Sequence, residues 1–301
     1  MLTPGGLDRA GLGRMLRSGL PLRAGPFVFC VRSPMRAVRD AIATLYADAP
    51  LAPEGGFHDF HVEVRPVRGL RRWIGPQVQF YVDGTAPFLP LPAGNAYAFL
   101  EWGMNWCVAG RAHHALLLHA AVLERGGRAV VLPGEPGAGK STLAAALMLG
   151  GWRLLSDEMA IVDLAGDRIH GMARPVNLKN ASIEIVRRRW PDAVFGEVFA
   201  DTHKGTVSHL RPPPGTMARA TEPAAPAHIV FPRWSAGAAT ALQPLARGDA
   251  FMRAANCAFN YSLLGRAGFL ALGAMVSASD CWAFEYSDLD QALATFEGLA
   301  A

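Results

Sequence analysis

The sequence is poor in charge and poorest in lysine. Charged residues make up 18% of its 301 residues, against roughly 25% in a typical soluble domain. The formal net charge is only +4, which is too mild to indicate a protein that binds nucleic acid. Of the 29 basic residues only three are lysines, Lys140, Lys179 and Lys204. Such a chain keeps a lysine where a compact ammonium group serves better than a planar guanidinium.

Cysteine pairs and long apolar runs are also absent. The four cysteines are dispersed without a Cys-x-x-Cys pair, so neither a disulfide framework nor a structural zinc site is predicted. The longest apolar runs, such as 267–278, stay short of the roughly 18 residues that a membrane span needs. The first 25 residues contain four arginines and no apolar signal core. We expect a cytoplasmic protein that does not bind membranes.

The first third of the chain predicts a small lobe of helices and strands. With 51% apolar residues the whole chain can bury a substantial core, as one large domain or two ordinary ones. Spacing of apolar residues predicts a helix over 35–45, antiparallel strands over 60–64 and 78–82, and a short helix over 100–108. We place a boundary near His113, which leaves residues 1–112 as an N-terminal α+β recognition lobe and 113–301 as a second domain.

The order of predicted elements at the start of the second domain is that of an α/β nucleotide-binding core. From residue 116 the order is strand, Gly126-Gly127 turn, strand, glycine-rich loop, alanine-rich helix and strand. The rest predicts a hairpin over 159–172, a proline-rich loop over 211–215, strands near 229–231 and 282–286, and a last helix capped by Ser287 with a core stripe of Leu289, Leu293, Phe296 and Leu299.

The glycine-rich loop matches the Walker A pattern of a phosphate-binding loop. A strand precedes it and a helix follows it, which is the context that the pattern requires. Glycines let backbone N–H groups wrap phosphate oxygens, the lysine bridges the β- and γ-phosphates, and the serine binds Mg²⁺. The nucleotide-binding residues are therefore Gly134, Pro136, Gly137, Ala138, Gly139, Lys140, Ser141 and Thr142.

Two acids follow the next apolar strand. Asp157 and Glu158 come directly after 154–156, and the carboxyl ends of adjacent strands in an open α/β sheet face one ligand crevice. One acid can hold Mg²⁺ while the other accepts a proton from an incoming hydroxyl. The alternative is a solvent-facing strand end with no chemistry.

Two common classes of phosphate-loop protein do not fit. The chain has no Leu-Ser-Gly-Gly-Gln signature of transport ATPases. The segment 177–180, Asn-Leu-Lys-Asn, lacks the aspartate that a guanine-specific Asn-Lys-x-Asp motif needs. Neither a transport ATPase nor a GTPase switch is therefore predicted.

Six stretches together resemble the catalytic domain of HPr kinase/phosphorylase, and within it the HPr-kinase-related kinase A branch. They lie within residues 116 to 286. The stretches are 118–122, 134–142, 154–158, 174–180, 203–213, and 259–261 with Gly265. The resemblance implies an α/β phosphate-loop kinase core, HPr kinase/PEP carboxykinase-like, preceded by the α+β lobe. It also implies a kinase that uses ATP and Mg²⁺ to phosphorylate a serine-type hydroxyl of a peptide or protein.

The resemblance also assigns roles to single residues. His119 matches an active-site histidine, although by itself a histidine in an apolar strand is more often part of the core. Asp157 matches the general base, and Glu158 stands where HPr kinase has an aspartate. Mg²⁺ would then be held by Ser141 with Glu158 or Asp157. Relatives with these motifs accompany peptide-modification genes, so a ribosomally made peptide is the preferred acceptor and a PqqD-like peptide chaperone a candidate partner.

Four further cations complete two candidate motifs. Arg174 and Lys179 flank a proline that disfavours helix, which predicts a fixed loop that binds phosphate or an acidic acceptor; an exposed basic loop is the alternative. Lys204 and Arg211 flank a segment too irregular for a core element, and we expect one of them to approach the transferred phosphate as an arginine finger does.

The sequence thus predicts an ATP-dependent serine kinase whose acceptor is a peptide or protein. The first alternative is a small-molecule kinase, which needs a closed pocket where a peptide enzyme needs an extended groove. The second is a nucleotide-gated binding module without transfer chemistry. The N-terminal lobe shows no catalytic constellation, and its strands offer edges for recruiting a substrate. Homo-oligomerisation stays open.

Overall fold

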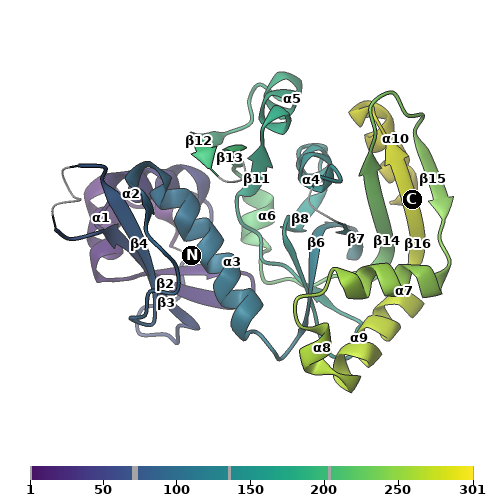
Figure 1. Cartoon of the computed structure of the whole chain (residues 1–301), viewed down its shortest axis with the longest axis horizontal. Coiled ribbons are helices and arrows are strands. Elements are labelled where there is room, and N and C mark those ends of the chain that lie inside the picture. Colours follow the sequence, from purple (N-terminus) through teal and green to yellow (C-terminus); the bar gives the residue numbers. More distant parts are fainter. Residues whose placement is uncertain (1, 70–73, 135–136, 203–204, 301) are drawn as a thin grey trace.

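The computed structural model describes residues 2–69, 74–134, 137–202 and 205–300 (Figure 1). Within these ranges the chain is a mixed α/β structure with three sheets. The expected α/β class is confirmed at this level, while the kinase core implied by the resemblance stays a prediction.

The N-terminal lobe is a five-stranded sheet with helices on one face. Its strands lie in the order β1 (Leu20–Ala24), β2 (Phe27–Arg32), β3 (Phe60–Pro66), β4 (Gln77–Val82) and β5 (Leu91–Pro92). The helices are η1 (Pro4–Gly6), α1 (Arg9–Ser18), α2 (Arg36–Leu45), η3 (Ala93–Asn95) and α3 (Ala96–Arg111). β2 and β3 are parallel and the other neighbours antiparallel. The predicted helices and the antiparallel pairing of β3 with β4 are confirmed.

The central sheet is built around β6 (Leu116–Arg125). β6 and β7 (Arg128–Pro133) form the predicted hairpin, and β7 then pairs in parallel with β14 (Ala225–Trp234). Beyond β14 lie the parallel β16 (Asp280–Tyr286) and the antiparallel edge strand β15 (Ala241–Pro244). On its other side β6 pairs with β8 (Arg153–Ser156) and β9 (Met159–Val162), and β10 (Ile169–His170) forms the predicted hairpin with β9.

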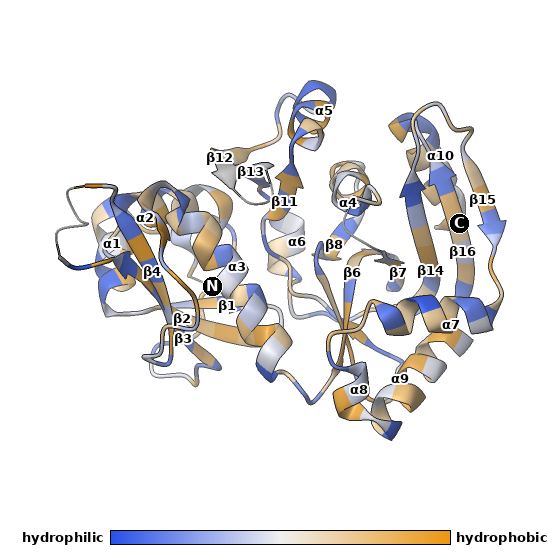
Figure 2. Ribbon diagram, in the orientation of Figure 1, coloured by the Kyte–Doolittle hydropathy of each residue, from blue (hydrophilic) through white to orange (hydrophobic). Residues whose placement is uncertain are grey.

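Helices cover both faces of this sheet (Figure 1). α4 (Lys140–Leu149) and α10 (Leu289–Leu299) share one apolar cluster with the strands. α7 (Arg247–Asn256) and α9 (Arg266–Ser277) share another, with α8 (Tyr261–Leu264) beside them. Because β6 is apolar on both faces, it is buried throughout most of its length and appears largely in the apolar colours of Figure 2.

The position of the two acids follows from the pairing of β8, which differs from the adjacent strands expected from the sequence. β8 is not adjacent to β7, because β6 lies between them and is antiparallel to both. β7 and β8 therefore run in the same direction, and their carboxyl ends still reach the same side of the sheet. Asp157 and Glu158 form a two-residue interruption, after which the chain continues beside β6 as β9.

The segment around 203–211 is more regular than predicted. β11 (Val176–Lys179), β13 (Gly205–Leu210) and β12 (Phe195–Thr202) form a third sheet in that order. β13 is its central strand, and Ser208, His209 and Leu210 are buried, so the expectation of an irregular segment is wrong. The last four residues of β13 are all buried, without the alternation that marks a strand in a sequence, and the prolines that follow lead into the short helix α6 (Pro214–Ala218). α5 (Ala181–Arg189) is mostly hydrophilic (Figure 2).

The last helix begins one residue later than predicted. Asp288, not Ser287, caps α10 by accepting a hydrogen bond from the backbone N–H of Gln291 at 2.8 Å. The Ser287 hydroxyl instead donates to the carbonyl of Ala238. The predicted stripe of α10 does pack against the core, with Phe296 fully buried.

The two lobes share buried surface. The apolar cluster of the N-terminal sheet continues into Leu117, Met159, Ile161 and Met172 of the second part of the chain. The boundary between residues 112 and 113, as a division into two domains, stays a prediction. Among the described helices, none has the length and apolar character required to cross a bilayer, and no disulfide joins the cysteines of the described chain.

Candidate active site

The predicted phosphate loop leads from β7 into α4, and two of its described glycines have positive φ. Gly137 and Gly139 have φ values of 92° and 87°, a region that favours glycine. An added Cβ at Gly139 would lie 2.6 Å from the hydroxyl of Tyr286, so packing also requires glycine there. No side chain of the described residues caps α4. The N–H groups of its first turn therefore remain available to a ligand.

Lys140 is the first residue of α4 and is buried. Its Nζ donates to the carbonyl of Gly134 across the loop. Burial lowers the pKa of Lys140; the charge of Lys179 lowers it further, whereas Glu158 and Asp157 raise it. Lys140 is thus a buried ammonium group at the start of α4, and the two predicted acids favour its charged form.

The other loop residues are partly accessible. Ser141 is half-buried, as is Thr142, whose hydroxyl donates to that of Ser182 on α5 at 2.6 Å. Thr142 thus faces α5. Pro136 lies outside the described residues.

Asp157 is buried, with 5% of its surface exposed. Its Oδ2 accepts a hydrogen bond from the backbone N–H of Asn177 at 2.9 Å. Burial, followed by the charge of Glu158, raises the pKa of Asp157 to about 7, although the Asn177 N–H and Arg174 act in the opposite direction. The reading of the acids as a solvent-facing strand end is therefore wrong for Asp157. A carboxyl group with a pKa near neutrality suits proton transfer.

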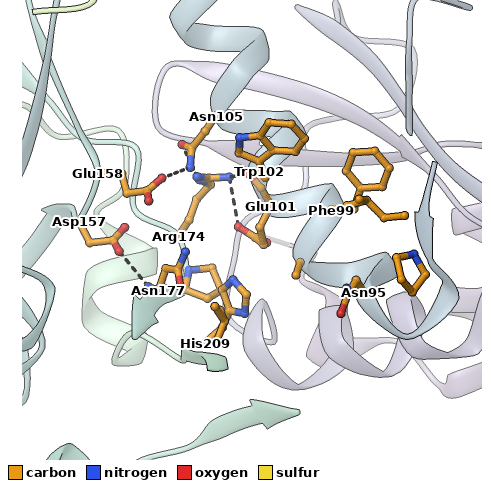
Figure 3. A pocket seen from close by; sticks show the side chains of 15 residues that line it. Asn95, Phe99, Glu101, Trp102, Asn105, Asp157, Glu158, Arg174, Asn177 and His209 are labelled. Carbon is orange, nitrogen blue, oxygen red and sulfur yellow. Dashed lines mark hydrogen bonds and ion pairs between the residues drawn. The ribbon is translucent and has the colours of Figure 1, made fainter. Parts of the chain in front are cut away.

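Glu158 is held by a chain of polar side chains that crosses into the N-terminal lobe (Figure 3). Asn105 donates to Glu158 and accepts from Arg174. Arg174 also pairs with Glu101, Nη1 to Oε2 at 3.1 Å, and Glu101 accepts from the Tyr46 hydroxyl at 2.8 Å. Burial raises the pKa of Glu101, and Arg174 beside it partly offsets this effect. The network fixes one acid of the pair against α3.

These residues line a cavity between α3 and the second part of the chain. Its lining is drawn in Figure 3 and comprises Leu91, Pro92, Asn95, Ala98, Phe99, Glu101, Trp102, Asn105, Asp157, Glu158, Arg174, Pro175, Asn177, Val207 and His209. Three buried polar atoms on this lining, Arg174 Nε, Asn177 Oδ1 and His209 Nδ1, have no hydrogen-bond partner among the described residues. Buried polar atoms of this kind are normally satisfied, so the cavity is suited to a polar ligand.

Arg174 does not have the setting that was predicted. It is buried and ion-paired, with 4% of its surface exposed, so neither a loop presenting two cations nor an exposed basic loop describes it. Burial opposes its charged form, but Glu101, Tyr46 and Glu158 raise its pKa. Lys179 belongs to strand β11 rather than to a loop. Arg174 therefore lies at the cavity, whereas Lys179 ends β11 and is not among the residues that line the cavity.

His119 and Arg211 are not among the residues that line the cavity. His119 lies on β6 opposite Met159, is half-buried, and its ring is 5.9 Å from that of Phe259. The guanidinium of Arg211 is bound to Asp48 of the N-terminal lobe, with Nε 3.2 Å from Oδ2. Arg211 thus joins the two parts of the chain, and its predicted approach to phosphate is untested. Lys204 lies outside the described residues.

Asn260, from the last of the stretches in the resemblance, has a clear structural role. Its side chain is buried, accepts from the backbone N–H of Leu117 and donates to the carbonyl of Ala115, at 3.0 and 2.8 Å. It thereby holds the start of β6, the strand that carries His119.

The sequence analysis missed the contribution of the N-terminal lobe. Glu101, Trp102 and Asn105 of α3 line the cavity together with Asp157, whereas nothing in the sequence analysis placed residues of this lobe beside the acids. A signal was present: Glu101 and Asn105 lie one helical turn apart within an otherwise apolar helix. His209 was also missed, because the strand that carries it was read as irregular.

The residues fit a nucleoside triphosphate and Mg²⁺ in chemical type. The uncapped N-terminus of α4 and the Lys140 ammonium are donors for phosphate oxygens. The Ser141 hydroxyl, with Glu158 or Asp157, is the oxygen donor set that Mg²⁺ prefers.

By its fold the chain is a mixed α/β protein with several sheets. No protein-family profile matches it, and no curated protein matches it. Among solved structures it is similar to an HPr(Ser) kinase/phosphatase from Coxiella burnetii, with 12% identity and a TM-score of 0.26, over 61% of this chain and 92% of that one.

Proposed function

We propose that the protein is a kinase that uses ATP and Mg²⁺ to phosphorylate a serine-type hydroxyl of a peptide or protein. The observation that carries the proposal is the setting of Asp157. This buried carboxyl group lines the cavity and follows β8, whose carboxyl end reaches the same side of the sheet as the end of β7, where the glycine-rich loop begins. Phosphoryl transfer requires a base on the same side as the phosphate site.

The chemistry divides among residues of this chain. ATP bound at the loop supplies the γ-phosphoryl group, and Mg²⁺ neutralises charge on its oxygens. Asp157 accepts the proton of the acceptor hydroxyl as the hydroxyl oxygen bonds to phosphorus. Lys140 offsets the negative charge left on the departing oxygen when its bond to phosphorus breaks. Ser141 and Glu158 are the proposed Mg²⁺ ligands, and Asn105 orients Glu158.

The acceptor occupies the cavity between α3 and the acids. Its polar end would satisfy Arg174 Nε, Asn177 Oδ1 and His209 Nδ1, the three buried atoms without partners in the described chain. Trp102 lines the cavity and is 38% exposed. An exposed aromatic side chain at this position suits contact with a peptide. A PqqD-like chaperone that delivers the peptide stays part of the proposal on the strength of the motif resemblance.

The second candidate is a small-molecule kinase. The cavity is lined by residues from the region of β5, α3, β11 and β13, together with the acid pair, and such convergence describes a pocket more closely than a long groove. The proposed chemistry at Asp157 is the same for either acceptor. The two candidates differ only in what fills the cavity.

Transfer of label from γ-labelled ATP separates the candidates. The protein is incubated with Mg²⁺, candidate peptides and a lysate, and the products are resolved by mass, with Asp157→Asn as the inactive control. We expect label on serine or threonine of a peptide or protein, absent with the variant. Label confined to a small molecule would establish the second candidate. Free phosphate alone, or nucleotide binding without consumption, would favour the nucleotide-gated module and remove the transfer proposal.

A further inference from the structure

Three metal-binding side chains meet on the N-terminal sheet, far from the phosphate loop in sequence. They are Cys30, His58 and His61, and one ligand atom from each, Sγ or an imidazole nitrogen, lies within 4.8 Å of the others. None of these residues is used in the proposed kinase chemistry.

Strand pairing places two of the three on the same face. Cys30 of β2 and His61 of β3 are register partners in the parallel pair. Their neighbours Phe29, Val31 and Val62 belong to the core beneath the helices. Because side chains alternate along a strand, Cys30 and His61 point to the opposite face of the sheet.

His58 is brought to the same place by an anchored turn. The next residue, Asp59, accepts a hydrogen bond from the backbone N–H of Val28 at 2.7 Å and donates its own N–H to the Val28 carbonyl at 2.9 Å. The rings of His58 and His61 are 5.4 Å apart at an interplanar angle of 80°. The ring positions therefore follow from the entry into β3 and not from a long free loop.

We propose that Cys30, His58 and His61 bind one divalent transition-metal ion of the Zn²⁺ type, with water as a fourth ligand. One thiolate and two imidazoles form a donor set that favours zinc over Mg²⁺ or Ca²⁺. Cys30 is buried, His58 half-buried and His61 exposed, so the site is closed toward the sheet and open toward solvent. Three protein ligands and an open position describe a zinc site that exchanges its fourth ligand.

The separation of the ligand atoms is compatible with this site after a small adjustment. Metal bonds of about 2.0 to 2.3 Å in tetrahedral geometry place ligand atoms roughly 3.3 to 3.8 Å apart. The ligand atoms lie within 4.8 Å of one another, so a bound ion would draw them together by roughly 1 Å or less at the widest pair. Gly19 leaves the space that Sγ occupies, since an added Cβ there would lie 2.5 Å from it.

Metal binding has a defined proton balance. Burial raises the pKa of the Cys30 thiol, and Arg32 beside it acts in the opposite direction. The thiol proton is released to solvent as the sulfur–metal bond forms, while both imidazoles bind as neutral ligands. The bound ion would tie β2, β3 and the turn at His58 together.

The test uses the full-length, metal-stripped protein without nucleotide and Co²⁺ as a spectroscopic substitute for Zn²⁺. We expect one equivalent of Co²⁺ to produce a thiolate-to-cobalt charge-transfer band that Zn²⁺ abolishes by competition. Cys30→Ser should remove the band, and His58→Ala and His61→Ala should each weaken binding by about tenfold or more. His113→Ala, which changes an exposed histidine outside the cluster, should bind as the parent does.

The proposal would be overturned if the parent protein bound no Co²⁺, or bound it without a thiolate band. It would equally be overturned if the band persisted in Cys30→Ser, or if both histidine variants kept the affinity of the parent. His61→Ala changes an exposed side chain, so it keeps the test decisive even if Cys30→Ser does not fold. Since the assay omits nucleotide and acceptor, its outcome is independent of the proposed kinase activity.

Discussion

The two walls of the cavity differ in how they are built. One wall carries Asp157 and Glu158, two residues of a short interruption that follows the phosphate loop in sequence. The other is α3, where Glu101, Trp102 and Asn105 project from a helix of the N-terminal lobe. On our proposal the acids of the first wall carry out phosphoryl transfer, and the residues of α3 select and position the acceptor. The comparison teaches that a motif can identify the reacting groups while the acceptor site depends on tertiary packing.

The largest expected effect tests the groups that we propose carry out phosphoryl transfer. Lys140→Ala removes the ammonium group beside the loop, and we expect both nucleotide affinity and turnover to fall, with turnover reduced by at least about a hundredfold. Isothermal titration with ATP and the label-transfer assay measure the two quantities. Normal nucleotide affinity in this variant would remove Lys140 from the phosphate site.

The next effect tests the wall formed by α3 through stability. Arg174→Leu leaves the buried Glu101 carboxylate without its ion-pair partner, which typically costs about 3 to 5 kcal/mol. The matched control is Arg189→Leu, because Arg189 pairs with Asp290 on the surface and such pairs contribute about 1 kcal/mol or less. Urea unfolding followed by circular dichroism measures both. Equal losses in the two variants would contradict a structural role for the buried pair.

A smaller effect concerns pH. Burial, together with Arg174, lowers the pKa of His209 to about 3, while an unfolded histidine titrates near 6.5. Between these values the unfolded state binds one proton more, so stability falls as pH falls, by up to about 1.4 kcal/mol per unit from this group. His209→Gln should reduce the slope of stability against pH below 6.5, and His113→Gln should not. Parallel slopes for all three proteins would show that His209 is accessible to protons in the folded state.

The smallest effect tests selection by α3. Trp102 and Trp106 are similarly exposed, at 38% and 37%, but only Trp102 lines the cavity. We expect Trp102→Ala to raise the KM for the acceptor by about tenfold, equivalent to about 1.4 kcal/mol, and to leave nucleotide affinity unchanged. Trp106→Ala should change neither. A similar rise in KM for both would place the acceptor on the outer surface of α3 instead of in the cavity.

Much of the first wall could be predicted from the sequence because its signals are local. The hairpin of β6 and β7, the glycine loop and α4 are contiguous, and each follows from its own residues. Asp157 was found in the same way, although the antiparallel β6 between β7 and β8 was not foreseen. The strand β13 was not predicted, because three prolines follow it. His209, which lies on this strand, was therefore not recognised as a candidate site residue.

The wall formed by α3 could not be predicted in the same way. Asn105 and Glu158 are 53 residues apart, and nothing in the helical spacing of α3 shows which element it will face. The polar Glu101 and Asn105 in this largely apolar helix indicate only that some polar partner exists. The approach of the lobe also changes the meaning of deleting residues 1–110: the deletion would expose Leu117, Met159 and Ile161 as well as remove a recruiting surface.

The central claim, that Asp157 acts as the base within a functional phosphate site, is tested most directly by Asp157→Asn. The substitution keeps the shape of the side chain and an oxygen that can accept from the Asn177 N–H. Turnover and nucleotide affinity are measured on the same preparation. We predict nucleotide affinity close to that of the parent and turnover reduced by about 10² to 10⁴. Near-normal turnover in this variant would contradict the assignment of the base.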